Sequence, residues 1–583
     1  MIRELMKSIR EYKKDSILAP VYVSLEVIME VIIPMMMAWL IDNGIDTGNL
    51  KYIWGMGAVL AVAAMVSLLF GALSGKAAAR ASAGFAKNLR KDMYDNVQNF
   101  SFFNIDKFST ASIVTRLTTD VTNVQNAYQM IIRMAVRGPF MIIFSMIMAF
   151  GINSRLAMIF LGVVPVLGIG LYIIMTKAHP VFERVFRTYD SLNNVVQENL
   201  HGIRVVKSYV SEDYEVEKFG KISGSIYQDF TKAEKLLAFN MPLMQFCVYA
   251  CMLLISWFGA RMIVLTGGDP VNGMSTGQLM SLITYTMQIL MSLMMLSMVF
   301  VMITMARASA ERIVEIKTEI SDLKNTEQPI TEVPNGSVDF DRVDFSYTKD
   351  TKKLCLSGVD LHIASGETVG IIGGTGASKT SLVQLIPRLY DATAGQVRVG
   401  GVNVCDYDIE SLRNQVAMVL QKNVLFSGTI KENLRWGNEQ ASDEEMVHAC
   451  QLAQADEFVR SFPDGYDTYI EQGGSNVSGG QKQRLCIARA LLKKPKILIL
   501  DDSTSAVDTK TDAQIRKAFR EEIPDTTKFI IAQRVSSIQD ADKIIVMDRG
   551  RIQAVGTHEE LLAGNDIYRE VYESQVKGGG QDE

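Results

Sequence analysis

A glycine-rich turn between a predicted strand and a predicted helix is the clearest chemical feature of this sequence. The segment ETVGIIGGTGASKTSLVQLI has β-branched residues before the turn and a helical pattern after it, the context that makes a phosphate-binding loop credible. We expect backbone N–H groups and the helix N-terminus to face phosphates, Lys379 to reach the β- and γ-oxygens, and Thr380 to hold Mg²⁺. The loop positions that predict MgATP binding are Gly373, Gly374, Thr375, Gly376, Ala377, Ser378, Lys379 and Thr380.

Ser378 departs from that loop pattern, which has a glycine beside the lysine. A Cβ atom therefore stands where the backbone should approach a phosphate closely. Taken alone, this residue counts against nucleotide binding.

A second strand supplies carboxylates. The segment KPKILILDDSTSAVD reads as a buried strand of a parallel sheet that ends in Asp501 and Asp502. Asp501 is placed to serve the Mg²⁺ shell. The segment NVSGGQKQRLCIARALL precedes this strand, and the combination makes a chance match improbable.

The elements that hold these loops form a soluble α/β domain in the second half of the chain. Apolar runs shorten after about residue 312, and TEISDLKNTEQPITEVPNGS reads as a polar linker. We expect a linker at 313–335, the nucleotide-binding domain at 336–575 and a disordered tail at 576–583.

The first half is predicted to cross a membrane six times. A helical span needs about 20 apolar residues, and hydrophobic residues make up 48% of the chain. We expect a transmembrane domain over 16–312, preceded by an amphipathic helix over 1–15 at the cytoplasmic face. The spans are expected at 16–41, 52–75, 128–151, 156–176, 236–260 and 270–306.

Positive charge orients these spans. The long connections, about 76–127 and 177–235, are rich in Lys and Arg, whereas the short loops carry few. The positive-inside rule therefore places both termini, both long connections and the nucleotide-binding domain in the cytoplasm of a multi-pass protein of the plasma membrane. The connections have helical spacing, so we expect the membrane helices to continue into the cytoplasm.

Four charges lie inside the predicted spans. Glu26 and Glu30 share one helix face, and Arg133 and Arg137 repeat that spacing two spans later. They form either a structural ion-pair cluster or a site for a cationic substrate or a proton. The Met-rich sixth span is either the lining of an adaptable apolar cavity or lipid-facing filler.

Composition excludes other classes of protein. The net charge of −5 argues against nucleic acid as a partner. The six cysteines show no C-x-x-C spacing, so neither a disulfide framework nor a typical zinc site is indicated.

The whole chain resembles the ABC transporters, specifically bacterial multidrug-type exporters built from half-transporters with six membrane helices and a nucleotide-binding domain. The resemblance implies that Tyr347 in VDFSY stacks on adenine and that Gln421 in MVLQKN is the Q-loop glutamine, a further Mg²⁺ ligand. Asn476 to Gln481 match the signature, in which Ser478 and Gly480 would contact the ATP of a second half-transporter. Two segments, near 103–108 and 207–212, resemble the intracellular coupling segments. Membrane lipids and an amphipathic small-molecule substrate are the other expected partners.

Two further residues depart from the family pattern. Asp502 stands where the family has its catalytic glutamate, and Gln533 in IIAQRVSSI stands where it has the switch histidine. The shorter carboxylate lies about 1.5 Å further back, and glutamine cannot exchange a proton as imidazole does. We expect slow hydrolysis and infer the degenerate-site half of a heterodimer. The alternatives are a homodimeric lipid or peptide exporter and a non-transporting, ATP-gated regulatory subunit.

Overall fold

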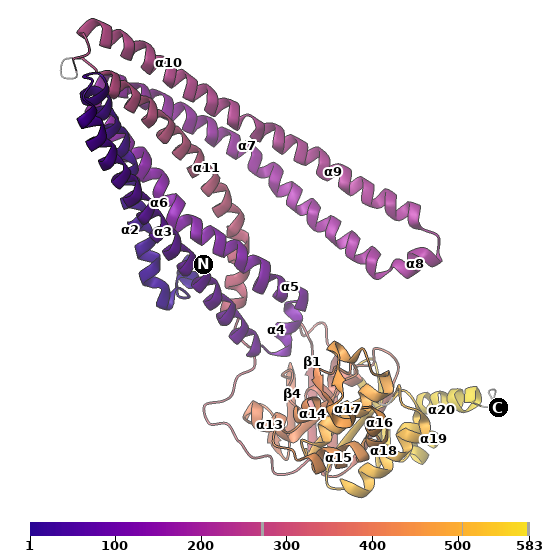
Figure 1. Cartoon of the computed structure of the whole chain (residues 1–583). Coiled ribbons are helices and arrows are strands. Elements are labelled where there is room, and N and C mark those ends of the chain that lie inside the picture. The colour runs from indigo at the N-terminus through magenta and orange to yellow at the C-terminus, as the bar shows by residue number, and fades with distance from the viewer. Residues whose placement is uncertain (270–272, 504, 580–583) are drawn as a thin grey trace. The chain divides into compact units, whose positions relative to one another are not determined.

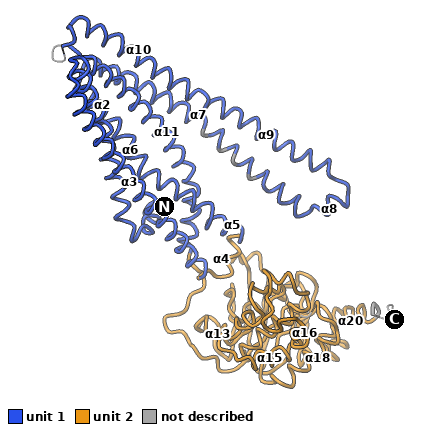
Figure 2. The backbone as a smooth tube through the Cα atoms, viewed as in Figure 1, with its two compact units in different colours: residues 1–98, 110–319 blue, residues 99–109, 320–583 orange. Residues whose placement is uncertain are grey.

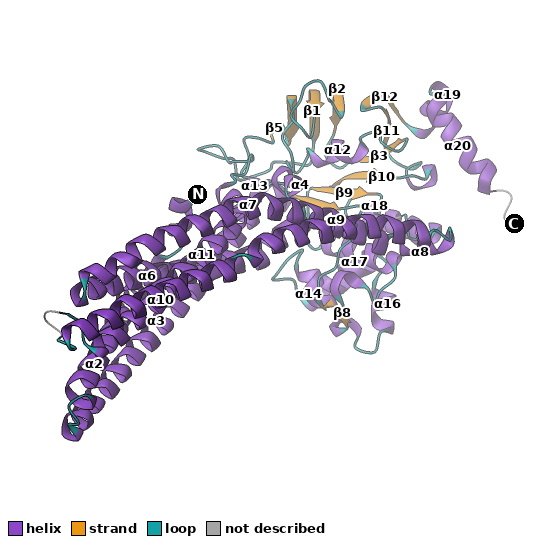
Figure 3. Cartoon of the chain, turned by 90° about the horizontal axis from the view of Figure 1, so that it is seen from above, coloured by secondary structure: helices purple, strands orange, loops and turns teal. Residues whose placement is uncertain are grey.

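The computed structural model describes residues 1–583 except 270–272, 504 and 580–583. The chain divides into two compact units, one of residues 1–98 and 110–319 and one of residues 99–109 and 320–583 (Figure 2). Among the described residues, strands occur only in the second unit (Figure 3).

The first unit is helical. Six stretches in the described part of the chain are long and apolar enough to cross a membrane: Ile2–Ile45, Leu50–Gln98, Thr110–Ile152, Ser154–His201, Glu212–Thr266 and Thr276–Thr318. Its elements are α1 (Ile2–Met6), η1 (Arg10–Tyr12), α2 (Lys13–Leu40), η2 (Ile41–Ile45), α3 (Leu50–Gln98), α5 (Thr110–Thr115), η3 (Arg116–Asp120), α6 (Val121–Ile152), α7 (Ser154–His201), α8 (Ile203–Ser208), α9 (Glu212–Ala238), α10 (Asn240–Thr266) and α11 (Thr276–Thr318).

The predicted extension of the membrane helices is confirmed. Helix α3 has 49 residues and α7 has 48. At 1.5 Å per residue each is about 70 Å long, more than twice the bilayer core of about 30 Å. Helix α7 runs beside α9, and the pair extends away from α2, α3 and α6 to a tip at α8 (Figure 1).

Several expected boundaries differ from the structure, and the linker expected from residue 313 begins later because α11 continues to Thr318. The helix expected over 1–15 is broken after α1, because the α3 side chains Asn88 and Asp92 bind the Ser8 carbonyl and hydroxyl, at 3.0 and 2.6 Å. The span expected from residue 270 begins at Thr276, because the Ser275 hydroxyl caps the helix by accepting from the Gln278 N–H at 3.1 Å. Residues 270–272 of that expected span lie outside the described residues.

Side chains of α11 bind backbone carbonyls of α2 in the turn before Pro34. Pro34 lacks an N–H and disrupts the hydrogen bonds of the preceding turn. The carbonyl of Glu30 accepts from Gln288 Nε2 at 3.3 Å, and the carbonyl of Val31 accepts from the Tyr285 hydroxyl at 2.7 Å. Both donors belong to α11, so the backbone groups are satisfied within the bundle, as a membrane interior requires.

The second unit contains two larger sheets and a two-stranded one. Its six-stranded sheet has the order β12-β11-β3-β10-β9-β6, with parallel pairing from β11 to β6, and its four-stranded antiparallel sheet has the order β2-β1-β4-β5. The strands are β1 (Val338–Phe345), β2 (Leu356–Ile363), β3 (Thr368–Gly373), β4 (Ala394–Val399), β5 (Val402–Asn403), β6 (Val416–Val419), β7 (Gly428–Thr429), β8 (Tyr469–Ile470), β9 (Ile497–Asp501), β10 (Thr527–Ile531), β11 (Lys543–Asp548) and β12 (Arg551–Gly556).

Helices surround these sheets. They are α4 (Phe102–Lys107), α12 (Lys379–Gln384), α13 (Ile409–Gln415), α14 (Ile430–Arg435), α15 (Asp443–Leu452), α16 (Asp456–Ser461), η4 (Gly465–Asp467), η5 (Gln472–Gly474), α17 (Gly479–Leu491), α18 (Thr509–Glu522), η6 (Val535–Ser537), α19 (His558–Gly564) and α20 (Asp566–Gly579). Helix α20 continues beyond residue 576, where the disordered tail was expected to begin, and residues 580–583 lie outside the described residues.

Candidate nucleotide site

The predicted phosphate loop connects β3 to α12. In this structure the Lys379 ammonium donates to the carbonyls of Gly373 and Gly374, at 2.8 and 3.0 Å. Burial lowers the pKa of Lys379, and Asp501 and Asp502 oppose that shift. The lysine is therefore held at the loop, beside the carboxylates at the end of β9.

Ser378 occupies a left-handed backbone conformation, with φ 67° and ψ 27°. This region costs a residue with a Cβ atom about 1–2 kcal/mol, whereas glycine enters it freely. The loop thus retains the backbone shape that favours glycine, although a serine now occupies it.

Asp501 and Thr380 meet at the Mg²⁺ position that the sequence predicts. The Thr380 hydroxyl donates to Asp501 Oδ1 at 3.0 Å, and Asp501 is 2% exposed. Burial is the main cause that raises the pKa of Asp501, and the neighbouring Asp502 adds to it. A carboxylate and a hydroxyl are hard oxygen donors of the kind that Mg²⁺ prefers, so these residues fit the ion.

The two residues that depart from the family pattern bind each other. Gln533 Nε2 donates to Asp502 Oδ2 at 2.6 Å. Strand β10 lies between β3 and β9, so Gln533, two residues after β10, falls between the phosphate loop and the end of β9. Asp502 is 8% exposed and has a φ of 50°. The carboxylate at the catalytic position is thus occupied by an amide donor.

A glutamine that the sequence analysis missed holds the loop after Gln533. Gln575 of α20 donates through Nε2 to the Gln533 carbonyl and accepts at Oε1 from the Val535 N–H, both at 2.8 Å. A single glutamine forty residues away carries no motif, so no signal in the sequence pointed to it.

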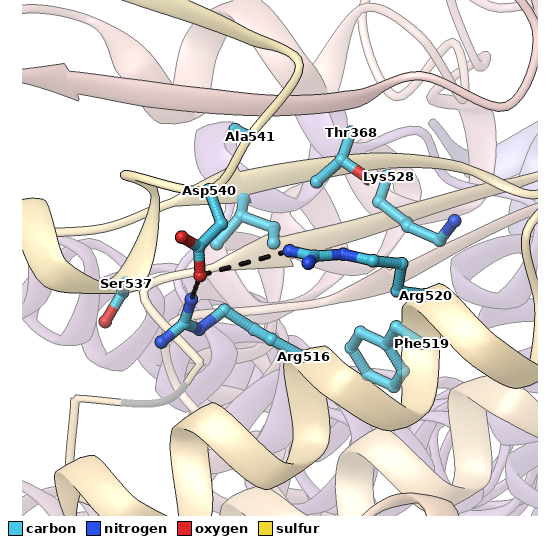
Figure 4. Close-up of a pocket in the computed structure, with 9 residues that line it drawn as sticks. Thr368, Arg516, Phe519, Arg520, Lys528, Ser537, Asp540 and Ala541 are labelled. Atoms are coloured by element: carbon cyan, nitrogen blue, oxygen red, sulfur yellow. Dashed lines mark hydrogen bonds and ion pairs between the residues drawn. The ribbon is translucent and has the colours of Figure 1, made fainter. Parts of the chain in front are cut away.

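An ion-pair network anchors the same loop from the other side. Ser537 donates to Asp512 Oδ2 at 3.0 Å, and Arg516 pairs with Asp512 at 3.2 Å and with Asp540 at 2.9 Å. Three of these residues, Arg516, Ser537 and Asp540, border a cleft of about 20 Å³ beside Arg520 and Lys528 (Figure 4). The cleft has room for little more than one water molecule and lies apart from the phosphate loop, so we assign it a structural role.

Tyr347 lies two residues beyond β1 and contacts α12. Its hydroxyl is 2.9 Å from Ser381 Oγ and donates to Gln384 Oε1 at 3.1 Å. Its ring also packs edge-to-face on Tyr390, with centroids 5.1 Å apart. Burial raises the pKa of the Tyr347 phenol. The expected adenine-stacking residue is thus fixed to the helix that follows the phosphate loop.

Gln421 makes no hydrogen bond to Thr380 or Asp501 within the part of the chain that the structure describes. It follows β6, is exposed, and its side chain makes no hydrogen bond to any residue that the structure describes. Its expected role as a ligand therefore stays a prediction.

The signature forms the start of α17. Ser478 is exposed and caps this helix, accepting at Oγ from the Gln481 N–H at 3.3 Å. A Cβ added to Gly480 would lie 2.8 Å from the Ala506 carbonyl oxygen, which explains the glycine. Within the described parts of the chain, no hydrogen bond joins Ser478 to the phosphate loop at 373–380.

The charges within the predicted spans form a partial cluster. Arg137 pairs with Glu26 and with Glu30, each at 2.6 Å, and thereby joins α6 to α2. Arg133 makes no ion pair with the described residues, and its Nε is buried without a hydrogen-bond partner. The guanidinium lies against α3, where a Cβ on Gly75 would be 3.5 Å away.

Known families match both halves of the chain. Residues 17–306 match the family described as ABC transporter transmembrane region, and residues 356–505 match the family described as ABC transporter. The uncharacterized ABC transporter ATP-binding protein YfiB of Bacillus subtilis is 36% identical over 99% of this chain and 100% of its own length. This chain belongs to the ABC transporters.

Two other similarities refine that assignment. The ATP-dependent lipid A-core flippase of Desulfotalea psychrophila is 35% identical to this ABC transporter over 82% of each chain. The structure of a bacterial Atm1-family ABC exporter with ATP bound has the same fold, with a TM-score of 0.82 and 24% identity over 97% of this chain and 99% of that one. The protein is therefore a multi-pass ABC transporter of the plasma membrane with a cytoplasmic ATP-binding domain.

Proposed function

We propose that this ABC exporter chain is the degenerate-site subunit of a heterodimer. It would bind MgATP in its own Walker site without efficient hydrolysis and complete the competent site of a different half-transporter with Ser478 and Gly480. The observation that carries the proposal is the 2.6 Å hydrogen bond between Gln533 and Asp502.

This bond removes the group that would prepare water for attack. A general base must contact the proton that it abstracts. Asp502 is one methylene shorter than glutamate, and its Oδ2 accepts from an amide that cannot exchange a proton. Both changes act on the same step, so we expect the chain's own site to be slow.

Apart from Ser378, the residues expected to bind nucleotide match the family pattern. Bound MgATP supplies the γ-phosphate whose transfer to water drives the family's transport cycle. Lys379 would leave its loop carbonyls to neutralise phosphate oxygens, Thr380 and Asp501 would hold Mg²⁺, and Tyr347 would stack on the adenine. A site that binds without turnover would hold the dimer closed while the partner site completes its cycle.

Two exposed surfaces support a dimer. Ser478 is solvent-exposed at the start of α17, as a group that serves another chain must be. At the tip of the α7–α9 pair, Val205, Tyr209 and Val210 are 60%, 78% and 83% exposed. Large apolar side chains clustered at one exposed tip indicate a protein contact. A pure nucleotide sensor has no need of the retained signature, which disfavours a non-transporting regulator.

For the substrate we favour amphipathic small molecules. Helix α11 exposes Met280, Met291, Met298 and Met305, and such flexible side chains adapt to apolar ligands of different shapes. Lipid export by a homodimer is the second candidate, favoured by the similarity to the lipid A-core flippase.

The experiment compares vanadate-sensitive ATPase activity of this chain alone, of the complex with its candidate partner, and of that complex carrying Ser478→Ala. We expect no activity alone, activity in the complex, and its loss on Ser478→Ala. Ser475→Ala is the matched control, because Ser475 is exposed nearby and its hydroxyl donates to Glu471 Oε2 at 2.7 Å. Robust turnover by the chain alone would overturn the heterodimer proposal.

A further inference from the structure

The segment 99–109, which follows α3, packs within the ATP-binding unit. The sequence analysis assigns it to the transmembrane domain, but its contacts place it with residues 320–583. The Tyr390 hydroxyl donates to Asp106 Oδ2 at 2.6 Å, and the Tyr390 ring lies edge-on to Phe102 at 6.0 Å. Tyr390 is 8% exposed, so a nearly buried phenol anchors this segment.

The same tyrosine contacts the candidate adenine residue. The rings of Tyr390 and Tyr347 are perpendicular, with centroids 5.1 Å apart. Such edge-to-face packing restrains each ring against rotation. Tyr390 therefore touches Tyr347 with its ring and Asp106 with its hydroxyl.

A second contact joins the same two segments. The Lys349 ammonium, two residues after Tyr347, lies 4.8 Å from the centre of the Phe103 ring and pairs with Asp322 at 2.7 Å. The loop that carries Tyr347 thus meets 99–109 both directly and through Tyr390.

We propose that Tyr390 is a positioning residue that couples nucleotide binding at Tyr347 to the seating of segment 99–109. The inference rests on the proposed role of Tyr347 as the residue that stacks on the base. The segment 99–109 continues covalently from α3. Its packing against the ATP-binding unit therefore lets nucleotide bound at Tyr347 act on a membrane helix without involving Gln421.

The chemistry of the contact suits this role. Burial raises the pKa of the Tyr390 phenol, and the hydrogen bond to Asp106 raises it further, so the hydroxyl keeps its proton and donates. A base stacked on Tyr347 would restrain that ring, and through the edge contact it would restrain the direction of the Tyr390 hydroxyl. Linkage requires the reverse effect to be equal: a seated segment favours nucleotide binding by the same factor.

The test is amide hydrogen exchange of 99–109 in the full-length protein, with and without Mg²⁺ and the non-hydrolysable analogue AMP-PNP. The variants are Tyr390→Phe, which keeps the ring and removes the donor, Asp106→Ala, and the double variant. Tyr407→Phe is the matched control, because Tyr407 is also a buried tyrosine and its hydroxyl donates to the Val399 carbonyl at 2.8 Å, not to the segment 99–109.

We expect AMP-PNP to slow exchange of 99–109 by about threefold to tenfold in the wild type, the range of one such hydrogen bond. In Tyr390→Phe and Asp106→Ala the protection should fall to less than about twofold, with no further loss in the double variant. The affinity of Tyr390→Phe for AMP-PNP should fall by the same factor as the protection of 99–109 from exchange. Tyr407→Phe should match the wild type in both measurements.

Full protection in Tyr390→Phe, or losses that multiply in the double variant, would overturn the coupling. Failure of the proposed nucleotide role has a different signature: AMP-PNP affinity would be unchanged by Tyr347→Ala.

Discussion

Replacing Asp502 and Gln533, two of the three departures from the family pattern, should restore hydrolysis at this chain's own site. The variants are Asp502→Glu, Gln533→His and the double variant. In the wild type, Asp502 Oδ2 accepts from Gln533 Nε2 at 2.6 Å, so two changes are required. The carboxylate must reach further, and its amide donor must be removed.

The structure allows the magnitudes to be worked out. An amide–carboxylate hydrogen bond is worth about 1.5–3 kcal/mol, or roughly tenfold to a hundredfold in rate when it must break first. The missing methylene displaces the carboxylate by about 1.5 Å, which costs on the order of a hundredfold. We expect the double variant to gain about 10³–10⁴-fold. Each single variant should gain less than its share. In Asp502→Glu the amide of Gln533 can still bind the longer carboxylate, and in Gln533→His the carboxylate is still too short.

The assay is phosphate release by the heterodimer, with the partner's own catalytic carboxylate replaced by an amide so that only this site turns over. Asp502→Asn serves as the control and should show no gain. The reasoning is refuted if the double variant binds ATP normally yet hydrolyses it no faster than the wild type.

Three further predictions test the site and the bundle. Ser378→Gly should stabilise the protein by about 0.5–1 kcal/mol in denaturant unfolding, because relief of left-handed strain, about 1–2 kcal/mol, outweighs the cost of the greater unfolded-chain entropy of glycine, about 0.4–1 kcal/mol. A loss of stability would contradict this strain argument. Affinity for MgATP should fall as the pH drops, because the protonated form of Asp501 cannot hold Mg²⁺. The fall should begin at a higher pH than for an ordinary aspartate, because burial raises the pKa of Asp501. Calorimetric titration across pH measures this affinity, and its pH dependence should vanish in Asp501→Asn. Glu30→Gln should lower thermal stability, because it weakens the ion pair with Arg137; unchanged stability with altered cation transport would instead favour a substrate site.

Much of this protein's architecture could be predicted from local sequence patterns. The six apolar stretches, the strand–loop–helix around Lys379 and the strand ending at Asp501 each depend on residues close together in the chain. Hydrophobic periodicity and turn residues involve positions only a few residues apart, so they can be recognised in the sequence without knowledge of the fold. The departures at Ser378, Asp502 and Gln533 were equally visible, because each occupies a fixed position within a motif.

Tertiary structure decided the contacts between distant segments. Three contacts depend on packing between separate elements. Gln533 binds Asp502, and Gln575 binds the backbone of the loop that carries Gln533. Tyr390 contacts both Asp106 and Tyr347. Packing likewise determines that Arg137 pairs with both Glu26 and Glu30, whereas Arg133 pairs with neither. A side chain's partner is set by the register and rotation of two packed elements, and a small shift in either exchanges one partner for another. Sequence spacing defines only one element at a time, so it determined which groups this chain carries, while the fold determined which of them meet.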